Sequence, residues 1–372
     1  MAAMDPALAQ LTDRIRAAAA DGHRLRIRGA GTKDFYGESP QGELLATGAL
    51  TGITSYEPSE LVVTARAGTP LAELEAALAA CGQCLPFEPP RFGPSGTGTV
   101  GGMIAAGLCG PARASVGAVR DYVLGATLVN GRGEVLAFGG QVMKNVAGYD
   151  ISRLLAGSLG TLGLIAEVSL KVLPIAPAEA TLRFECTQSD ALRLLNGWGA
   201  QPLPLNASRW SEQDATGALW LRLRGAVAAV DAACRHLGGE RQPDAQAQPD
   251  WQAARDQRLP WFGIPGAHSL WRLSVPQTAP AIDFETAPLL EWHGAQRWYL
   301  ASANQGARLR AAARTAGGHA TLFRIADGAS QAARSVPRFD ALSAPLARIH
   351  RALLREFDPH AVFDHARLLG AD

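Results

Sequence analysis

Apolar and polar positions in the first 174 residues follow two different periods. Apolar residues recur at helical spacing in some segments, whereas short apolar runs between glycine- and proline-rich turns predict strands elsewhere. Two strand-like runs flank the turn Asn130–Gly133 and predict a β-hairpin, so the sheet should be at least partly antiparallel. The predicted elements are a helix over 7–20, strands over 23–28 and 60–68, a helix from Thr69 (N-cap) and Pro70 (first residue) to about Ala80, a hairpin over 121–138, a helical turn over 150–156 and a strand over 164–172 that alternates between two faces.

The second half alternates strand-like runs with alanine-rich helical stretches. This order predicts a layer of strands covered by helices. The Gln-, Pro- and Asp-rich segment 240–252 predicts an exposed loop, and residues 344–357 predict a final amphipathic helix. The other patterns are strands over 180–186, 217–225, 269–276, 296–302 and 320–326, and helices over 225–238 and 304–317.

A Pro- and Ala-rich segment near residue 174 marks the expected domain boundary. A chain of 372 residues, 47% hydrophobic and 19% charged, is long enough for about two domains. We therefore expect a first domain over 1–174, an α+β cap domain over 175–340 and a C-terminal segment over 341–372 whose helix packs back on the first domain.

The densest run of glycines lies between Pro89 and Pro111. Glycine reaches positive φ and lets the backbone approach a ligand, and a following helix adds its N-terminal dipole, so the run predicts a cradle for a dinucleotide pyrophosphate. Gly96, Gly98 and Gly101 also spell G-x-G-x-x-G, but prolines rather than a strand precede them, which argues against a Rossmann site. A glycine-rich surface loop without ligand is the other reading.

A second glycine-containing turn, Gly29–Lys33, directly follows a predicted strand. Two glycines, a hydroxyl and a cation suit an anion, although from these residues alone a plain loop is an equal alternative.

Charge and cysteine content narrow the possible partners and location. The formal net charge is +1 without long runs of one sign, so nothing favours nucleic acid or an anionic membrane surface. The N-terminus mixes charges into a helical pattern, unlike a signal peptide, and no run approaches a membrane span, so the cytoplasm is the expected location. Five scattered cysteines predict neither a disulfide framework nor an iron–sulfur site, and the C-x-x-C at Cys81 and Cys84 follows a helix end at Gly82, which favours a structural role over a redox one.

Four motifs in order resemble the p-cresol methylhydroxylase-type FAD-binding domain. They are RGAGTK (28–33), GTVGGMIAAGLCGP (98–111), VRDYVLG (119–125) and GYDISRLLAGSLGTLGLIAEVSLKVLP (148–174). Later segments, LWRLSVP (270–276), GGHATLFR (317–324) and FDP (357–359), are most similar to the FAD-binding subunits of glycolate oxidase (glycolate dehydrogenase) complexes. The resemblance implies an α+β fold with a two-subdomain FAD-binding domain of this type and an α+β cap domain.

The same resemblance implies a cofactor and partners. FAD is expected to be non-covalent, because the first loop lacks the histidine to which some relatives attach it. The implied partners are a catalytic FAD subunit and an iron–sulfur subunit of the same complex. Binding to these partners would also allow a peripheral position at the inner membrane. The cofactor-binding residues it implies are Gly29, Ala30, Gly31, Thr32, Lys33, Pro94, Ser95, Thr99, Val100, Gly101, Gly102, Ala105, Gly160 and Ile165.

The sequence departs from the catalytic relatives at two places. They often read Gly-Gly-Asn where this chain has Gly101-Gly102-Met103, and carry a second asparagine at the position of Gly107. This chain therefore lacks the two asparagine side chains that could donate hydrogen bonds there, so its contacts to the flavin ring should differ from those of the relatives.

No catalytic residue or metal site follows from the sequence. His319 is the best single polar candidate in the cap, with Arg272 and Arg324 as carboxylate binders, although ordinary salt bridging is the favoured account of these residues. His360 and His365 fit no metal-ligand spacing and are expected to face solvent. Three readings follow: a flavin-bearing subunit that takes part in oxidation of glycolate or a similar 2-hydroxy acid, a structural subunit with a vestigial flavin site, and a self-sufficient 2-hydroxy-acid oxidase.

Overall fold

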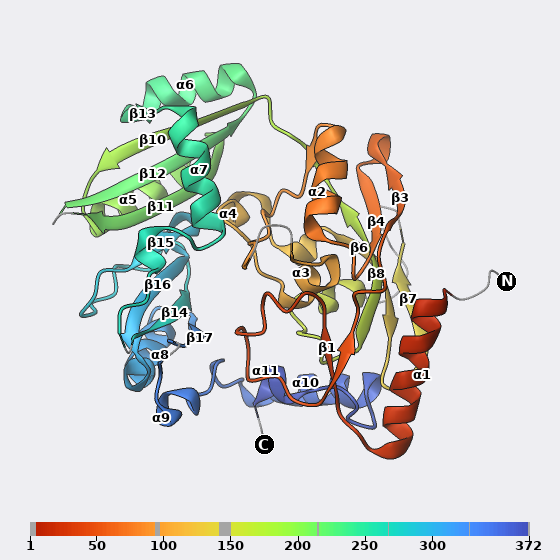
Figure 1. Cartoon of the computed structure of the whole chain (residues 1–372). Coiled ribbons are helices and arrows are strands. Elements are labelled where there is room, and N and C mark those ends of the chain that lie inside the picture. Colours follow the sequence, from red (N-terminus) through yellow and green to blue (C-terminus); the bar gives the residue numbers. More distant parts are fainter. Residues whose placement is uncertain are drawn as a thin grey trace. The chain divides into compact units, whose positions relative to one another are not determined.

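The computed structural model describes residues 5–93, 97–140, 150–213, 216–266, 268–326 and 328–370 (Figure 1). The chain divides into two compact units, each with its own sheet and helices. Unit 1 comprises Met1–Leu108, Ala118–Pro174 and Ala341–Asp372, and unit 2 comprises Cys109–Gly117 and Ile175–Asp340. No helix among the described residues is long and apolar enough to span a bilayer.

Unit 1 is built on a five-stranded antiparallel sheet in the order β3-β4-β8-β6-β7. The predicted hairpin is confirmed as β6 and β7. A parallel pair, β1 and β2, and an antiparallel pair, β5 and β9, complete the strands. Their bounds are β1 (Leu25–Arg28), β2 (Glu43–Ala46), β3 (Ile53–Glu57), β4 (Val62–Arg66), β5 (Gln83–Cys84), β6 (Val123–Val129), β7 (Val135–Gly139), β8 (Leu164–Lys171) and β9 (Leu173–Pro174).

The strand predicted over 164–172 is confirmed as β8, and its burial follows the predicted alternation between two faces. β8 lies between β4 and β6 at the centre of the sheet. Its partly exposed residues, Glu167 and Lys171, lie on one face, whereas the residues of the other face are all buried. One face of β8 is therefore fully covered and the other only in part.

The helices of unit 1 are α1, α2, α3, α10 and α11. The predicted helices at the two ends of the chain are confirmed with nearly the expected bounds. The bounds are α1 (Pro6–Asp21), α2 (Leu71–Ala80), α3 (Val100–Ala106), α10 (Ala344–Phe357) and α11 (Ala366–Leu369), with a 3-10 turn at Ser152–Leu155.

The start of α2 differs from the prediction. Pro70, and not Thr69, occupies the N-cap position, where it offers no capping side chain. The Thr69 hydroxyl instead accepts from the Gly52 amide (3.0 Å) and donates to the Gly52 carbonyl (3.1 Å). The Thr69 hydroxyl, which the local pattern predicted as the helix cap, therefore binds Gly52, a residue distant in sequence.

The C-terminal segment belongs to unit 1. The Leu25 amide donates to the Val362 carbonyl (2.7 Å), and Val362 and Phe363 are buried in a cluster with the apolar residues of α1. Within α10 only Leu354 and Phe357 are buried, so its apolar stripe is covered at the C-terminal end alone.

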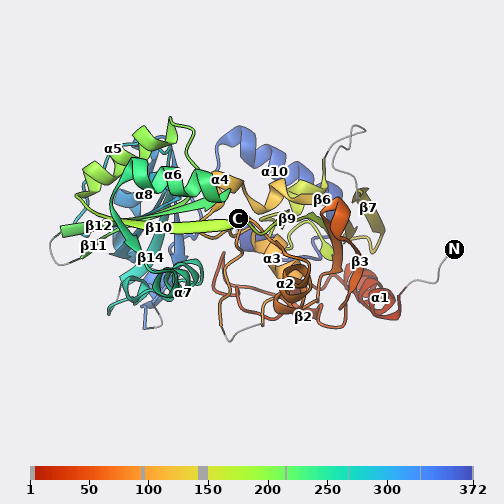
Figure 2. The ribbon, with the colours of Figure 1, turned by 90° about the horizontal axis from the view of Figure 1, so that it is seen from above.

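Unit 2 contains an eight-stranded antiparallel sheet in the order β13-β10-β12-β11-β15-β16-β14-β17. Helices α5, α6 and α8 cover one face and α7 the other (Figure 2), which confirms the predicted layer of strands under helices. The bounds are β10 (Ala178–Glu185), α5 (Gln188–Gly199), β11 (Leu205–Gln213), β12 (Thr216–Gly225), α6 (Val227–Leu237), β13 (Glu240–Gln242), α7 (Asp244–Arg255), β14 (His268–Ser274), β15 (Leu289–Glu291), β16 (Gln296–Ser302), α8 (Gly306–Thr315) and β17 (His319–Arg324).

The exposed loop predicted over 240–252 is wrong, because this segment forms β13 and most of α7. Ala247, Trp251 and Ala254 are buried at spacings of four and three, and the Trp251 indole donates to the Thr181 hydroxyl (2.9 Å). This packing outweighs the backbone hydrogen bond that Pro249 removes inside the helix.

The segment Cys109–Gly117, which contains α4 (Arg113–Val116), groups with unit 2 although the sequence boundaries kept it in the first domain. The Trp292 indole donates to the Gly110 carbonyl (2.9 Å), and the Arg113 guanidinium lies 4.5 Å from the centre of the Trp292 ring. These contacts join residues far apart in sequence, which local patterns do not reveal.

Candidate functional site

Two glycine-containing loops of unit 1 line a common hollow of about 100 Å³. The first loop, Gly29–Lys33, follows β1. The second contributes Thr99, at the N-cap of α3, and Gly102 and Ala105 within α3. The structure thus brings together two runs that the sequence singled out separately.

The first loop offers unsatisfied donors to an anion. Gly31 has φ of +74°, a left-handed conformation that helps successive amides converge. In the described part of the chain, the amides of residues 30–33 have no acceptor.

Lys33 adds a cation without a counter-ion. Its side chain is partly buried and has no acidic partner among the described residues. Desolvation lowers the pKa of the Lys33 ammonium to about 8. A partly buried cation and free amides in one loop are the donor set that a phosphate or pyrophosphate requires.

The two loops touch at Gly29 and Thr99. A Cβ atom at Gly29 would collide with the Thr99 hydroxyl, so only glycine fits there. The same hydroxyl accepts from the Gly102 amide (3.2 Å) and so caps α3.

The first amides of α3 are occupied within the chain. The Val100 amide donates to the Thr69 carbonyl (3.0 Å), and the Gly101 amide donates to the Ala67 carbonyl (2.8 Å). With Gly102 bound to the N-cap hydroxyl, all three amides have acceptors within the chain, and their role toward a phosphate stays a prediction. The helix packs closely on the end of β4, where a Cβ at Gly101 would lie 2.6 Å from Ala67 Cβ.

A second hollow, of about 60 Å³, shares Gly29, Gly102 and Gly160 with the first. It extends to Ile165 on β8, and Gly160 has φ of +79°, which favours glycine. Gly160 and Ile165, which the resemblance implied as cofactor-binding residues, therefore lie next to the loop with free amides.

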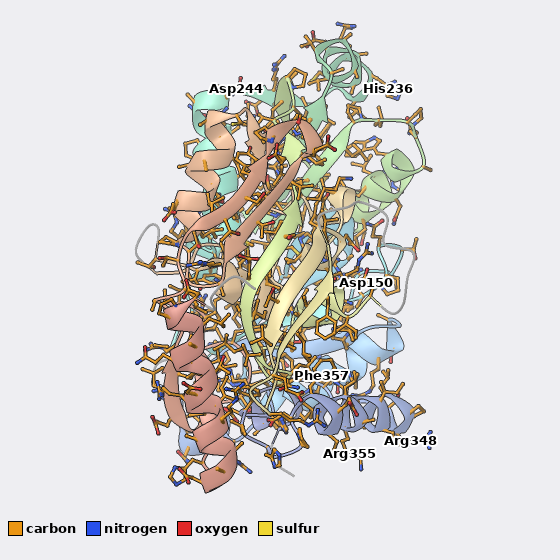
Figure 3. All side chains as sticks on the ribbon, turned by 90° about the vertical axis from the view of Figure 1, so that its right-hand side faces the viewer. Asp150, His236, Asp244, Arg348, Arg355 and Phe357 are labelled. Carbon is orange, nitrogen blue, oxygen red and sulfur yellow. The ribbon has the colours of Figure 1, made fainter. Side chains whose placement is uncertain are left out.

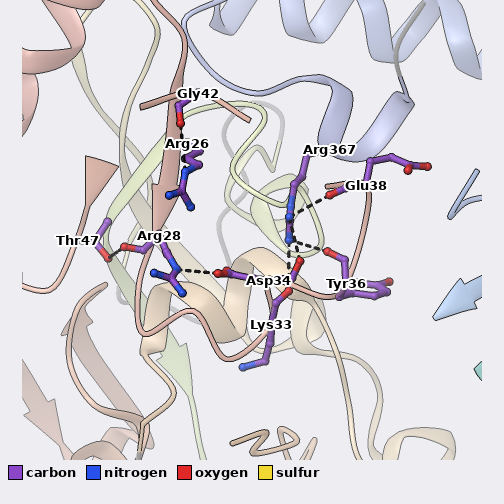
Figure 4. Close-up of polar contacts among 9 residues, drawn as sticks. All are labelled: Arg26, Arg28, Lys33, Asp34, Tyr36, Glu38, Gly42, Thr47 and Arg367. Atoms are coloured by element: carbon purple, nitrogen blue, oxygen red, sulfur yellow. Dashed lines mark hydrogen bonds and ion pairs between the residues drawn. The ribbon is translucent and has the colours of Figure 1, made fainter. Parts of the chain in front are cut away.

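Arg367 holds in place the last residue of the first loop, Lys33, and the chain that follows it to Glu38 (Figure 4). Its Nη1 donates to the carbonyls of Asp34 (3.2 Å) and Glu38 (3.0 Å). Its Nη2 donates to the carbonyls of Lys33 (3.3 Å) and Tyr36 (2.7 Å). Four backbone carbonyls thus depend on one buried guanidinium from the other end of the chain.

Not every predicted residue lines these hollows. Val100 is buried and lines neither one, whereas Pro94 and Ser95 lie outside the described residues. Conversely, Asp364 and Arg367 line the first hollow and were missed. No repeated spacing or composition marked them, because their partners lie over 300 residues earlier in the chain.

Comparison with known proteins agrees with this geometry. A model of the FAD binding domain family matches residues 7–139. Glycolate oxidase subunit GlcE of Escherichia coli (strain K12) is 44% identical over 358 residues, which cover 96% of each chain. The chain belongs to the glycolate oxidase subunit GlcE family.

Other proteins are similar to this GlcE-family chain over less of its length or with lower identity. Glycolate oxidase subunit GlcD of Bacillus subtilis (strain 168) is 33% identical over 164 residues, or 43% of this chain and 34% of that one. A solved structure of alkyldihydroxyacetonephosphate synthase matches with a TM-score of 0.64 and 14% identity over 95% of this chain and 73% of that one, which shows the fold alone. The predicted fold class and FAD cofactor are confirmed at the level of the family.

Two departures from the catalytic relatives have local causes in this GlcE-family chain. Gly107 ends α3 with φ of +60°, and a Cβ there would lie 2.9 Å from Gly157 Cα, so the close approach of Gly157 requires glycine. Met103 is buried in the core. Neither position offers a polar side chain to a flavin ring.

The polar candidates of unit 2 lie on β14 and β17. His319 and Arg272 interact electrostatically; burial, and secondarily Arg272, lowers the pKa of the His319 imidazole. Arg324 donates to the Gln257 side chain (2.9 Å). Arg324 therefore makes an ordinary hydrogen bond within the chain.

Of the two histidines near the C-terminus, His360 is exposed as expected, whereas His365 differs. His365 does not face solvent freely, since its Nε2 lies 2.8 Å from the buried carboxylate of Asp358. Within the described ranges, no three His, Cys, Asp or Glu side chains gather as metal ligands would.

Proposed function

We propose that this chain is the FAD-carrying subunit of a glycolate oxidase complex and takes part in oxidation of glycolate, or a similar 2-hydroxy acid, to the 2-oxo acid. The observation that supports it most is the first loop, which lines one hollow and carries a partly buried, unpaired lysine and four amides without an acceptor among the described residues. When bound, FAD supplies a ring that accepts two electrons from such a substrate.

The residues of unit 1 fit such a cofactor. We assign Gly29–Lys33 to the pyrophosphate, with Thr99 and Gly102 closing the opposite side. Gly160 and Ile165 suit the adenosine side. Ala105 lines both hollows. We assign Val100 and Gly101 to holding α3 in position, because their amides donate to carbonyls of the chain itself.

The partners in this proposal are a second, catalytic FAD subunit and an iron–sulfur subunit. The name of the Escherichia coli relative, a subunit of glycolate oxidase, supports an assembly of several chains. The proposed place is the cytoplasm, with any attachment to the inner membrane made by the partners. The alternative of a structural subunit with a vestigial flavin site draws support from the three occupied amides of α3.

Purified protein is expected to carry FAD that acid releases, because the donors of the first loop form hydrogen bonds and ion pairs and no attachment histidine lies in that loop. The measurement is absorbance of the supernatant and of the pellet after acid precipitation. A colourless chain that takes up no added FAD would support the structural alternative, and flavin that stays on the pellet would contradict non-covalent binding.

The affinity for FAD is expected to fall as pH rises above about 8. The Lys33 pKa is about 8 without ligand, and a bound pyrophosphate would raise it by favouring the charged form. The contribution of Lys33 is therefore complete below pH 8 and is lost as pH rises through the higher pKa of the complex. FAD titrations from pH 6.5 to 10 measure this.

Lys33→Arg is the matched control, because arginine keeps its charge over this range. Its affinity should stay level where the wild-type affinity falls. Equal pH profiles for the wild type, Lys33→Arg and Lys33→Met would remove Lys33 from the anion site.

A further inference from the structure

The helix α10 carries an apolar stripe whose N-terminal half is exposed. Leu346 and Ile349 are 49% and 55% exposed, and Leu342, just before the helix, is 40% exposed. Within the helix, spacings of three and four place Leu346, Ile349 and the half-buried Leu353 on one face, and Leu342 lies just before the N-cap residue Ser343. No comparable helical run occurs among the other large exposed apolar side chains of the described residues.

This exposure is not that of a loose helix end. Phe357 and Leu354 are buried, and the Phe357 ring packs against Phe138 of β7 with 6.1 Å between ring centres. The Phe357 carbonyl also accepts from the Gly131 amide (2.9 Å). The C-terminal turns are therefore fixed to unit 1, and α10 is a regular helix through the exposed turns.

The opposite face of α10 is basic. Arg348, Arg351 and Arg355 are exposed and have no ion-pair or hydrogen-bond partner within the described part of the chain. Figure 3 shows Arg348 and Arg355 on this helix. At 100° per residue the three arginines lie within about 60° of one another and nearly opposite Leu346 and Ile349.

We propose that the exposed half of α10 binds a partner polypeptide of the complex, in an apolar groove with acidic residues along its walls. This inference rests on the proposed function, which makes the chain one subunit of several. Apolar anchors spaced four and three apart are typical of a helix held in a groove. Three unpaired arginines provide the charge that acidic walls would complement and would speed association.

The short exposed length of the stripe favours a protein groove over a lipid surface. A helix that lies in a membrane interface buries a continuous apolar face and carries basic residues on its polar face, and its binding scales with the apolar area that it buries. The arginines of α10 suit both occupants, but Leu354 and Phe357 are already buried in the protein, so only the N-terminal turns could enter lipid. A groove can bind such a short apolar segment and also contact the arginines.

The test is purification of the complex through a tag on this chain. Leu346→Ser with Ile349→Ser is expected to reduce the co-purified partner chains at least tenfold, while leaving the melting temperature and FAD content of the tagged chain unchanged. Val227→Ser with Ile175→Ser is the matched control, because both side chains are 54% exposed but lie elsewhere. It should retain the partners.

The arginines are tested by Arg348→Glu with Arg351→Glu, which should release the partners at lower salt than the wild type requires. Retention of partners by the serine and glutamate variants would overturn the inference while leaving the proposed function intact. A wild-type chain that purifies without partners would overturn both. A stripe-dependent homodimer, or stripe-dependent binding to anionic vesicles, would replace the proposed occupant by a second copy or by lipid.

Discussion

Gly101→Val is expected to lower the melting temperature of the protein by roughly 6–12 °C, which corresponds to about 3 kcal/mol for a unit of this size. A Cβ at Gly101 would lie 2.6 Å from Ala67 Cβ and 3.1 Å from the Ala67 carbonyl oxygen. Ala67 is buried, and its methyl group is fixed to the backbone and cannot rotate away, so α3 must move away from the end of β4. FAD should be lost as a consequence, since α3 lines both hollows.

Two small substitutions test whether the contact between residues 101 and 67 causes the loss of stability. Gly101→Ala alone should destabilise the protein, and Ala67→Gly in the same chain should restore most of the loss by removing the opposing methyl group. Calorimetric melting of both single variants and the double variant measures the coupling. Additive effects would mean that the contact between these two residues does not limit the packing of α3.

Gly102 provides a contrast. Its Cβ would lie 3.1 Å from the Thr99 hydroxyl and it lines both hollows. Gly102→Ala should therefore weaken FAD binding more than it lowers the melting temperature, and the reverse ranking would place the cofactor elsewhere.

Arg367→Met is expected to weaken FAD binding by roughly a hundredfold, equivalent to about 3 kcal/mol. Methionine keeps the aliphatic stem but removes all four hydrogen bonds to the carbonyls of Lys33, Asp34, Tyr36 and Glu38. Without them the first loop becomes mobile, and binding must supply the ordering free energy. Fluorescence titration of the apoprotein with FAD measures the dissociation constant.

Arg367→Lys is the conservative comparison, because an ammonium keeps the charge but lacks the planar fork that reaches two pairs of carbonyls. The dissociation constant of this variant for FAD should lie between those of the wild type and the methionine variant. A purely structural role would lower the melting temperatures of the FAD-free and FAD-bound proteins equally. A role in positioning the loop lowers the FAD-bound value more, since less binding energy is added.

The sequence predicted the elements whose stability comes from local pattern. Apolar periodicity located α10 and the hairpin of β6 and β7 almost to the residue. It failed over 240–252, where proline and polar residues masked the stripe that buries Trp251 in α7. Local rules also misplaced Thr69, whose hydroxyl binds Gly52.

In the candidate site, too, local composition located some residues and missed those whose partners are distant in sequence. Glycine content and one lysine located Gly29–Lys33, because such a loop has a local composition. The amides of Val100 and Gly101 bind carbonyls from other segments, and composition could not reveal these partners. Arg367 was missed for the same reason, as a single arginine in a short tail has no pattern.

The hydrogen bond from Arg367 to the Lys33 carbonyl joins residues 334 positions apart. During translation the loop that is assigned to the pyrophosphate is made more than 300 residues before the arginine that holds it. A nascent chain that lacks Arg367 cannot keep the loop fixed, so flavin capture should wait until this residue has left the ribosome. Products that stop before Arg367 would then bind flavin poorly, and retained flavin would report that the chain extends at least to this residue.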